Sequence, residues 1–409
     1  MVRLIAWNII QQVFRQEVYS NIALSKALKH EQLSDVDQRL LTQLVYGVIQ
    51  HQRQLDYFLR PMIEGKKITP GVRYLLFLSL YQMKYMDKIP MYAIVNEAVN
   101  IAKTMTPPQD PFVNAILRNI KDNDEPMTES ERLSVSDWLL KQLKGQYPSD
   151  YEAILQSYFK EPKRSARFNP QKTNIKELAL QGFQASTVSP VGVIYSLGNI
   201  ANSDAFKRGY VTIQDEASQL VALQVAPKPG ERVLDMCAAP GGKATHLAEL
   251  LQGTGEVVAN DIHAHKCALI EETVRRLSLT NVTISNHDAL KLNKIHFRES
   301  FDHVLLDAPC TGWGVIGRKP EIKYFTNETK QDDLITLQAQ LLEVASFLVK
   351  VGGRLVYSTC TLNKGENDVQ VQRFLMSHPT FECLEEQTVL PHTNNTDGFY
   401  IATLRKRQR

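Results

Sequence analysis

The stretch Val233–Thr245, VLDMCAAPGGKAT, decides how the second half of this chain folds. Its first three residues predict a buried strand that ends in an acid. Small side chains follow at Ala238–Gly242, and the apolar residues of 246–251 then begin a helix. A strand, a tight turn and a helix in this order form the first unit of a nucleotide-binding sheet, with the ligand at the carboxyl end of the strand.

The glycines of this turn restrict the kind of ligand. Their spacing is neither the G-x-G-x-x-G of dinucleotide-binding turns nor a phosphate-binding loop that closes on G-K-[ST]. Small side chains nevertheless let the backbone approach a ligand closely. An adenosyl ligand without phosphates fits better, which indicates S-adenosylmethionine. The alternative is an ordinary glycine-rich turn without a ligand.

Length and composition place the chain among globular proteins. It has 409 residues, enough for two or three domains at ~150 residues each. Hydrophobic residues make up 43% and charged residues 22%. The net charge of +3 is mildly basic, so a nucleic-acid partner would need local clusters of basic side chains.

Membrane, secretion and metal-binding classes are not expected. No apolar run approaches the ~20 residues of a membrane span, and the N-terminal segment lacks a signal-peptide cleavage site. The five cysteines are irregularly spaced and include no C-x-x-C pair. We therefore expect no disulfide framework, no metal site and a reducing, cytoplasmic location. Nothing in the sequence demands more than a monomer.

The first 125 residues have the periodicity of an antiparallel helical bundle. One apolar stripe recurs at helical spacing, and Ser34 with Asp37 predicts the start of its helix. The segment Arg73–Met83 is apolar almost all round and is expected at the centre of the bundle. The stripe comprises Leu33, Val36, Leu40, Leu44 and Val48.

A change of composition predicts a second part at residues 126–205. The acidic, polar stretch Lys121–Ser136 is typical of a linker. After it, short helical and strand-like patches, including Ser165–Phe168 and Gly192–Leu197, indicate a small α+β module. Its basic side chains either contact phosphates or form a solvated face. They are Lys160, Lys163, Arg164 and Arg167.

Residues 206–409 alternate between strands and helices, which predicts a mostly parallel, doubly wound α/β sheet. The expected strands are Arg232–Asp235, Glu256–Asn260, Val282–Ser285, His303–Asp307 and Arg354–Ser358. The expected helices are Ala244–Leu251, His265–Leu277 and Leu334–Val349.

Polar and nucleophilic residues follow several of these strands, so they should meet in one crevice. Asp261 ends the second strand and is placed to accept hydrogen bonds from ribose hydroxyls. Asp288 follows the third strand and either faces an adenine amino group or caps a helix. Cys310 and Cys360 follow the fourth and fifth strands, beside Asp307.

Two thiols next to a carboxylate suit one kind of methyl transfer. The C5 carbon of cytosine is a weak nucleophile, and a thiolate that adds to C6 makes it able to attack a methyl group. A carboxyl group stabilises the charge that develops, and a base must afterwards remove the C5 proton. Lys243 could lower a thiol pKa or orient that base. For Cys237 and Cys267, a buried structural role is the simpler interpretation.

Four motifs together resemble the RNA cytosine-C5 methyltransferases of the Nol1/Nop2/Sun family. They are DMCAAPGGK, LDAPC with the T-G-x-G that follows, YSTCT with Glu366-Asn367, and GYVTIQDEAS at 209–218. The N-terminal bundle resembles NusB, as does that of the family's bacterial branch that methylates small-subunit ribosomal RNA. The resemblance covers nearly the whole chain. It implies an all-α NusB-like RNA-binding domain at 1–125, the α+β module at 126–205 and a Rossmann-like S-adenosylmethionine-dependent methyltransferase domain at 206–409.

The resemblance also implies roles for single residues and a substrate, 16S ribosomal RNA. Cys360 matches the nucleophile and Cys310 the cysteine that assists product release, while Asp307 serves both the reaction and the cofactor. Thr311 stands where serine is common and Lys266 where arginine often stands, which puts the Lys266 contact in doubt. The implied S-adenosylmethionine contacts are Cys237, Ala238, Ala239, Pro240, Gly241, Gly242, Lys243, Asp261, Lys266, Asp288 and Asp307.

Three other interpretations of the sequence stay open at this point. One is methylation of an amine, which would make the cysteines unnecessary. Cys310 could be the nucleophile, as the cysteine of the PC motif is in DNA cytosine-C5 methyltransferases. Alternatively, the chain could be a non-catalytic RNA-binding factor in which the helical bundle does the work and the sheet is a scaffold. The intact turn and the two thiols favour an enzyme.

Overall fold

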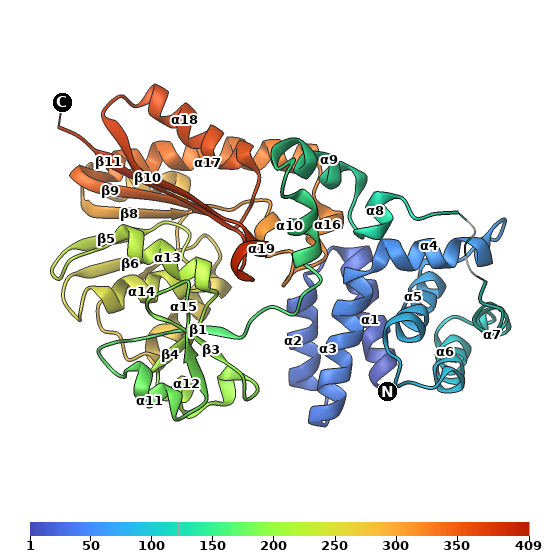
Figure 1. Cartoon of the computed structure of the whole chain (residues 1–409). Coiled ribbons are helices and arrows are strands. Elements are labelled where there is room, and N and C mark those ends of the chain that lie inside the picture. The colour runs from blue at the N-terminus through green and yellow to red at the C-terminus, as the bar shows by residue number, and fades with distance from the viewer. Residues whose placement is uncertain (122, 124, 409) are drawn as a thin grey trace. The chain divides into compact units, whose positions relative to one another are not determined.

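A computed structural model describes residues 1–121, 123 and 125–408 (Figure 1). The chain forms two compact units, and neither is continuous in sequence. Unit 1 comprises Met1–Phe159 and Ile316–Asn327, and unit 2 comprises Lys160–Val315 and Glu328–Arg409. The division into three functional parts at residues 125 and 205 stays a prediction.

Unit 1 is built from helices, as the periodicity of its sequence predicts. The side chain of Ser34 caps α3 by accepting a hydrogen bond from the backbone N–H of Asp37 at 3.2 Å. Every residue in the middle of α5, from Leu75 to Gln82, is buried. Its helices are α1 (Val2–Gln16), α2 (Ser20–His30), α3 (Asp35–Gln50), α4 (Gln52–Ile63), α5 (Pro70–Tyr85), α6 (Met91–Met105), α7 (Asp110–Arg118), α8 (Glu129–Arg132), α9 (Asp137–Gln146), α10 (Tyr151–Ser157) and α16 (Ile322–Phe325).

Two details of unit 1 differ from expectation. Val36 is 66% exposed, because the buried face of α3 is centred on Leu41, Leu44 and Val45. The second half of the expected linker is ordered, because Thr128 and Glu131 form a capping box that starts α8. Of that stretch, residues 122 and 124 lie outside the described residues.

The segment 316–327 belongs to unit 1 although it lies within the sequence of unit 2. Its acid Glu321 accepts hydrogen bonds from the backbone N–H of Ser20 at 3.0 Å and from the Ser20 hydroxyl at 2.8 Å. Its base Lys323 donates from Nζ to the carbonyl of Gln50 at 3.0 Å. Both charged side chains are buried, so these partners replace the water that they lose on folding.

Unit 2 contains a seven-stranded sheet in the order β10-β11-β9-β8-β5-β6-β7. The strands from β9 to β7 are mutually parallel, and β11 is antiparallel to both of its neighbours. The five predicted strands are confirmed, whereas the two C-terminal strands were not predicted. The strands are β5 (Arg232–Asp235), β6 (Glu256–Asn260), β7 (Val282–Ser285), β8 (Phe301–Asp307), β9 (Val349–Thr359), β10 (Phe381–Val389) and β11 (Phe399–Lys406).

Helices cover both faces of this sheet (Figure 1). Alternate strand residues point to opposite faces, so Val233 packs with α13 (Glu216–Val225), α14 (Gly242–Leu250) and α15 (Ala264–Arg276). Leu234 packs on the other face, with α17 (Glu328–Leu348) and α18 (Asp368–Ser377). The predicted doubly wound α/β arrangement is therefore confirmed. Short helices complete the unit: α11 (Ile175–Ala179), α12 (Asp204–Lys207) and α19 (Pro391–Asn394), with the 3-10 turns η1 (Ile200–Asn202), η2 (Ala289–Lys294), η3 (Trp313–Val315) and η4 (Lys364–Glu366).

A second, four-stranded sheet has the order β2-β3-β1-β4 and is antiparallel throughout. One expectation for this module is wrong: Arg167 cannot contact phosphates, because its side chain is completely buried against Glu249. Lys163 is held by Glu216 at 3.0 Å, and Arg164 pairs with Glu161 at 3.0 Å. Its strands are β1 (Ser165–Phe168), β2 (Phe183–Ala185), β3 (Gly192–Tyr195) and β4 (Val211–Ile213).

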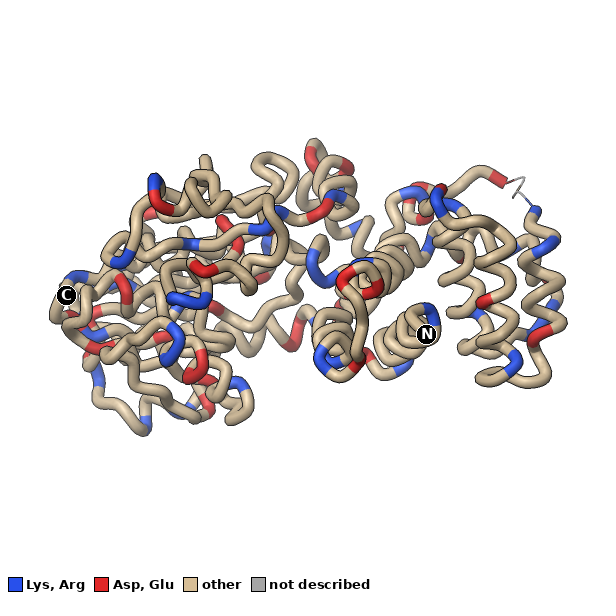
Figure 2. The backbone as a smooth tube through the Cα atoms, turned by 90° about the horizontal axis from the view of Figure 1, so that it is seen from below, with Lys and Arg blue, Asp and Glu red and all other residues tan. Residues whose placement is uncertain are grey.

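Charged residues are distributed along both units, and Figure 2 shows Lys and Arg interspersed with Asp and Glu. This distribution agrees with the small net charge of +3. Within the described part of the chain, no helix has the length and apolarity that a membrane crossing requires.

Burial of Lys323 should make the stability of the protein depend on pH. Burial lowers the pKa of Lys323 to about 7, from an ordinary value of 10.5. Between these values the unfolded chain binds the extra proton, so stability should rise as pH rises from 7, by at most ~1.4 kcal/mol per pH unit. The variant Lys323→Met should lack this rise in unfolding free energy, measured by denaturant titration from pH 7 to 9.

The matched control is Lys103→Met, which removes an exposed lysine from α6 of the same unit. It should keep the pH dependence of the parent protein. A parallel pH profile for Lys323→Met and the parent protein would contradict the assignment of the pH dependence to Lys323.

Candidate active site

The two cysteines that follow β8 and β9 lie side by side. Asp307 of β8 is paired with Ser358 of β9 in parallel register, so both strands end at the same edge of the sheet. Cys310 and Cys360 follow these ends, and their sulfur atoms are 3.3 Å apart. The predicted convergence of the two thiols is therefore present in the structure.

A lysine and a carboxylate lie beside the thiols. Lys243, at the start of α14, donates from Nζ to Asp307 Oδ2 at 2.7 Å. Ser358 donates from its hydroxyl to the other oxygen, Oδ1, at 2.7 Å. Burial lowers the pKa of Lys243, but the attraction of Asp307 and of Cys360 outweighs it and holds that pKa above its ordinary value. Asp307 therefore holds the lysine in its charged form.

The two thiols have different environments. The hydrogen bond with Cys360, followed by burial, raises the pKa of Cys310 well above its ordinary value. Cys310 therefore stays protonated at neutral pH.

A buried carboxylate, Glu366, connects the loops that hold the thiols. It accepts hydrogen bonds from the backbone N–H of Thr311 at 2.9 Å, from Gln338 at 2.9 Å and from Asn363 at 2.9 Å. The hydroxyls of Thr311 and Thr361 are 2.7 Å apart. Each threonine directly follows one cysteine, so this network fixes both loops. Burial raises the pKa of Glu366 despite the four hydrogen bonds that favour its charged form.

Two glycines allow a third chain segment to approach these loops. Gly314 donates its N–H to the carbonyl of Cys360 at 3.0 Å, and its own carbonyl accepts from the N–H of Gly398 at 2.8 Å. A Cβ atom on Gly314 would lie 2.0 Å from the Gly398 oxygen. Gly314 of the T-G-x-G sequence and Gly398 of the D-G-F sequence are therefore required by close backbone contact.

The small-residue turn leads from β5 into α14, as its sequence predicts. Gly241 caps the helix with a φ of 103°, a conformation that favours glycine. A side chain there would also meet Ile270 of α15, at 3.2 Å from its Cα. Asp235, at the end of β5, is fully buried. Burial, followed by repulsion from Asp307, raises the pKa of Asp235 to about 8.

The other predicted contact residues surround this turn at the carboxyl edge of the sheet. Burial and the charges of Asp235, Asp307 and Asp261 raise the pKa of Cys237, whereas Lys266 acts in the opposite direction. These groups therefore lie close enough to Cys237 to interact with it. Asp261 is 8% exposed and accepts a hydrogen bond from the backbone N–H at position 263. The residues Ala238, Ala239, Pro240 and Gly242 form the backbone of the turn itself.

Two residues at the carboxyl ends of the strands interact with other groups of the protein. Asp288 caps η2 by accepting from the N–H of Leu290 at 3.0 Å, and it pairs with Lys291 at 3.2 Å. The sulfur of Cys267 is directed at the carbonyls of Asp261 and Ser285. Cys267 is therefore a buried structural residue, as expected.

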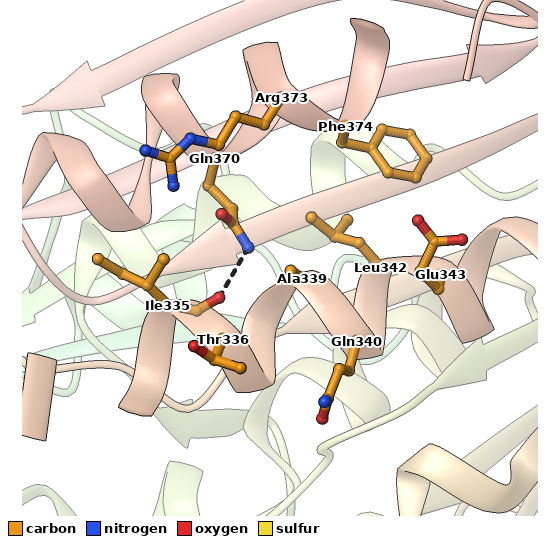
Figure 3. A pocket seen from close by; sticks show the side chains of 9 residues that line it. All are labelled: Ile335, Thr336, Ala339, Gln340, Leu342, Glu343, Gln370, Arg373 and Phe374. Carbon is orange, nitrogen blue, oxygen red and sulfur yellow. Dashed lines mark hydrogen bonds between the residues drawn. The ribbon is translucent and has the colours of Figure 1, made fainter. Parts of the chain in front are cut away.

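A cavity of about 350 Å³ lies elsewhere, between α17 and α18 (Figure 3). Its lining is mostly apolar and contains no thiol, so it takes no part in the site described above. Ile335 and Gln370 are joined across it by a hydrogen bond of 3.1 Å. Within the described ranges, no cluster of three or more His, Cys, Asp or Glu side chains has a metal-binding arrangement.

Comparison with known proteins agrees with this geometry. A model of the 16S rRNA methyltransferase RsmB/F family matches residues 222–405, and a model of the NusB family matches residues 1–122. The probable ribosomal RNA small subunit methyltransferase B of Bacillus subtilis is 39% identical, with 99% of each chain covered. This chain belongs to the RsmB/F family of rRNA methyltransferases. The predicted family, with its NusB-like N-terminal region, is thus confirmed.

Other relatives extend the likeness of this RsmB/F-family methyltransferase. The protein of the same description from Synechocystis is 35% identical, again with 99% of each chain covered. The crystal structure described as PH0851 is 29% identical and superposes with a TM-score of 0.86 over 99% of each chain. As a member of the family, the chain is an S-adenosylmethionine-dependent enzyme that methylates ribosomal RNA.

Several residues of this RsmB/F-family site were not identified from the sequence as part of its geometry. Glu366 belongs to a motif that the sequence shows, but its hydrogen bonds do not follow from the motif, and Gln338 belongs to no motif. Gln338 stands on α17, far from both cysteines in sequence, yet it donates to the carbonyl of Pro309 at 2.9 Å. A glutamine at a core position of an amphipathic helix is the sequence feature that could identify Gln338 as a buried polar residue.

Removing the charge of Glu366 should disorganise both cysteine loops. In Glu366→Gln, an amide N–H₂ would face donors from Thr311, Gln338 and Asn363, and leaving a buried donor unpaired costs ~1–3 kcal/mol. Misplacement of the thiols should lower the methylation rate by about 10²-fold. Single-turnover methylation and thermal unfolding measure the two effects.

Glu328→Gln, at the exposed start of α17, makes the same chemical change outside the network. It should leave both measurements unchanged. A Glu366→Gln protein that methylates at the parent rate would show that the network does not position the thiols.

Proposed function

We propose that this protein methylates C5 of a cytosine in 16S ribosomal RNA, with Cys360 as nucleophile and Cys310 as the residue that assists release. The observation that supports this proposal is the separation of 3.3 Å between the two thiols, next to Asp307. Methylation of an oxygen or an amine needs only positioning and a base. A thiol is needed where a ring carbon must first be activated, and a second thiol beside it is placed to assist the later breakdown of the adduct.

The residues present suit each step of this reaction. The Cys360 thiolate adds to C6 of the cytosine, and its electron pair makes C5 nucleophilic. S-adenosylmethionine, when bound, would supply the methyl group: C5 would form a bond to this carbon as its bond to the sulfonium sulfur breaks, leaving S-adenosylhomocysteine. A base then accepts the C5 proton, and the electron pair of that C–H bond restores the ring as the bond between C6 and sulfur breaks and returns Cys360 as a thiolate. Asp307, held by Lys243 and Ser358, is placed to stabilise charge on the ring.

The raised pKa of Cys310 makes it the less suitable nucleophile of the two thiols. The ammonium of Lys243 interacts with Cys360, and the hydrogen bond between the thiols keeps Cys310 protonated. Cys310 is therefore left free of the C6 bond, and as a thiolate it can accept the C5 proton after methyl transfer, when the adduct breaks down. The opposite assignment, with Cys310 as nucleophile, is an outcome of the experiment below.

The carboxyl ends of β5 and β6 also suit the binding of S-adenosylmethionine. A turn of small side chains brings backbone N–H groups to the end of β5, and Gly241 adopts the conformation that this turn needs. Asp261 presents a carboxylate oxygen at the end of β6, where ribose hydroxyls of an adenosine are expected. We assign the cofactor to residues 237–243 with Asp261, Lys266, Asp288 and Asp307.

The helical part of the chain and the α+β module are proposed to bind the RNA. We place these functions in residues 1–125 and 126–205, ahead of the methyltransferase part at 206–409, in a monomeric, cytoplasmic protein. The support is the NusB-family match over residues 1–122. In this proposal the sheet of unit 2 supplies the chemistry, and the other parts supply most of the affinity for ribosomal RNA.

Asp261→Ala should weaken binding of S-adenosylmethionine, because the ribose hydroxyls lose a charged acceptor. A hydrogen bond to a charged group contributes ~1.5–3 kcal/mol, and isothermal titration calorimetry measures the change. Asp288→Ala should cost less, because Asp288 is engaged as a cap. Asp302→Ala, at the opposite end of the strands, should bind like the parent protein. Unchanged affinity in Asp261→Ala would remove that residue from the site.

The two cysteines should differ in the complexes that they leave on RNA. Cys360→Ala should neither methylate nor form a covalent adduct, because the bond to C6 cannot form. Cys310→Ala should attack and methylate but resolve the adduct slowly, so denaturing gels should show a stable protein–RNA complex. Bisulfite sequencing of the RNA locates the methylated cytosine.

Cofactor binding in each variant controls for unfolding. An adduct that persists in Cys360→Ala and vanishes in Cys310→Ala would reverse the two assignments. Binding of RNA without methylation or adduct in the parent protein would instead support a non-catalytic RNA-binding factor.

A further inference from the structure

Arg167 of β1 is buried in unit 2 with every N–H of its guanidinium group hydrogen-bonded. Nε donates to Glu249 at 3.0 Å, and Nη1 donates to the side chain of Gln214 at 2.9 Å and to the carbonyl of Gly242 at 2.9 Å. Nη2 donates to the hydroxyl of Thr245 at 2.9 Å and to Glu249 at 3.3 Å. A guanidinium has five donors, so this one is fully satisfied.

Three of the partners lie on one face of α14. Gly242, Thr245 and Glu249 are spaced three and four residues apart, which aligns them along the helix. The arginine therefore spans the helix from its first turn to its last. The ion pair with Glu249 neutralises the buried charge, while the remaining donors reach toward the start of the helix.

The start of this helix is the small-residue turn of the cofactor site. The hydroxyl of Thr245, which accepts from Arg167, itself donates to the carbonyl of Gly241 at 2.7 Å. Arg167 thus contacts the Gly242 carbonyl directly and the Gly241 carbonyl through one side chain. Ile270 packs against the turn at Gly241, where a Cβ atom would lie 3.2 Å from the Cα of Ile270.

Stability alone does not account for a buried arginine with this geometry. Replacing a buried ion pair by apolar side chains of similar volume is often neutral or stabilising. A planar fork with fixed donor directions does, however, hold several acceptors in one relative position. Here those acceptors are the backbone of the cofactor turn and the helix that it begins.

We propose that Arg167 is a positioning residue for S-adenosylmethionine, which it serves from the four-stranded sheet by holding the Gly241–Gly242 turn in its binding conformation. The inference rests on the assignment of this turn to the cofactor under the proposed function. It gives the α+β module a part in cofactor binding, in addition to any contact with RNA.

The test compares Arg167→Lys with Arg276→Lys in the full-length protein. Lysine at 167 keeps the charge beside Glu249 but cannot reach the turn and the glutamate together. Arg276 is the matched control, because it joins α15 to the carbonyls of Phe206 in α12 and Val211 in β4 of the small sheet, and among the described residues none of its hydrogen bonds reaches the turn. We expect the KM for S-adenosylmethionine to rise at least about tenfold in Arg167→Lys alone.

Further measurements separate positioning from folding. At saturating cofactor, kcat and RNA affinity should stay near the parent values in Arg167→Lys, and hydrogen exchange should quicken at residues 241–245. If Arg167→Lys does not fold, Glu249→Gln tests the same clamp, since it removes the ion pair without touching the turn, and it should raise the KM for the cofactor.

Three results would decide against the inference or its premise. An unchanged KM for the cofactor in folded Arg167→Lys, with weaker binding in Asp261→Ala, would overturn the role of Arg167 alone. An equal rise in Arg276→Lys would show a general effect of loosening the module. Unchanged cofactor binding in Asp261→Ala would instead reject the proposed cofactor site.

Discussion

The parallel register of β8 and β9 is the constraint on which the chemistry of this protein depends. With Asp307 opposite Ser358, the residues that follow each strand leave the sheet at the same level. A shift of one residue would turn the side chains of one strand to the other face and separate the two thiols. The adjacent core residues Leu305 and Val356 pack on α13 and α14, so the hydrophobic pattern maintains this register.

Buried charged side chains then hold the loops and the turn that follow the strands in fixed positions. Glu366 gathers the two cysteine loops, Arg167 holds the turn at the start of α14, and Lys243 joins that turn to Asp307. In each network, nearly all donors and acceptors are hydrogen-bonded to other members of the network. Such networks are costly when one partner is missing, and they therefore resist partial rearrangement. The three strand ends of the site are in this way held by side chains from distant parts of the chain.

Sequence patterns predicted the strands whose side chains are buried on both faces, because continuous apolar runs such as 233–234 and 304–306 stand out. They also predicted which residues follow those strands, since parallel strands share an edge. Strands β10 and β11 were missed, because β10 has glutamates at 382, 385 and 386 and lies at the edge of the sheet. The role of Arg167 is not visible in the sequence, since it follows the basic residues Lys160, Lys163 and Arg164, whereas its partners on α14 lie 75 to 82 residues away.

The segment 316–327 has a consequence for how this protein can be divided. The polypeptide passes between the two units at 159–160, at 315–316 and again at 327–328. Dividing the chain at one position therefore never yields two complete units. Residues 1–159 would lack Glu321, which accepts hydrogen bonds from Ser20, and residues 160–409 would expose Lys323 and Tyr324. Genetic exchange of either unit between relatives must accordingly transfer two separate stretches of the gene together.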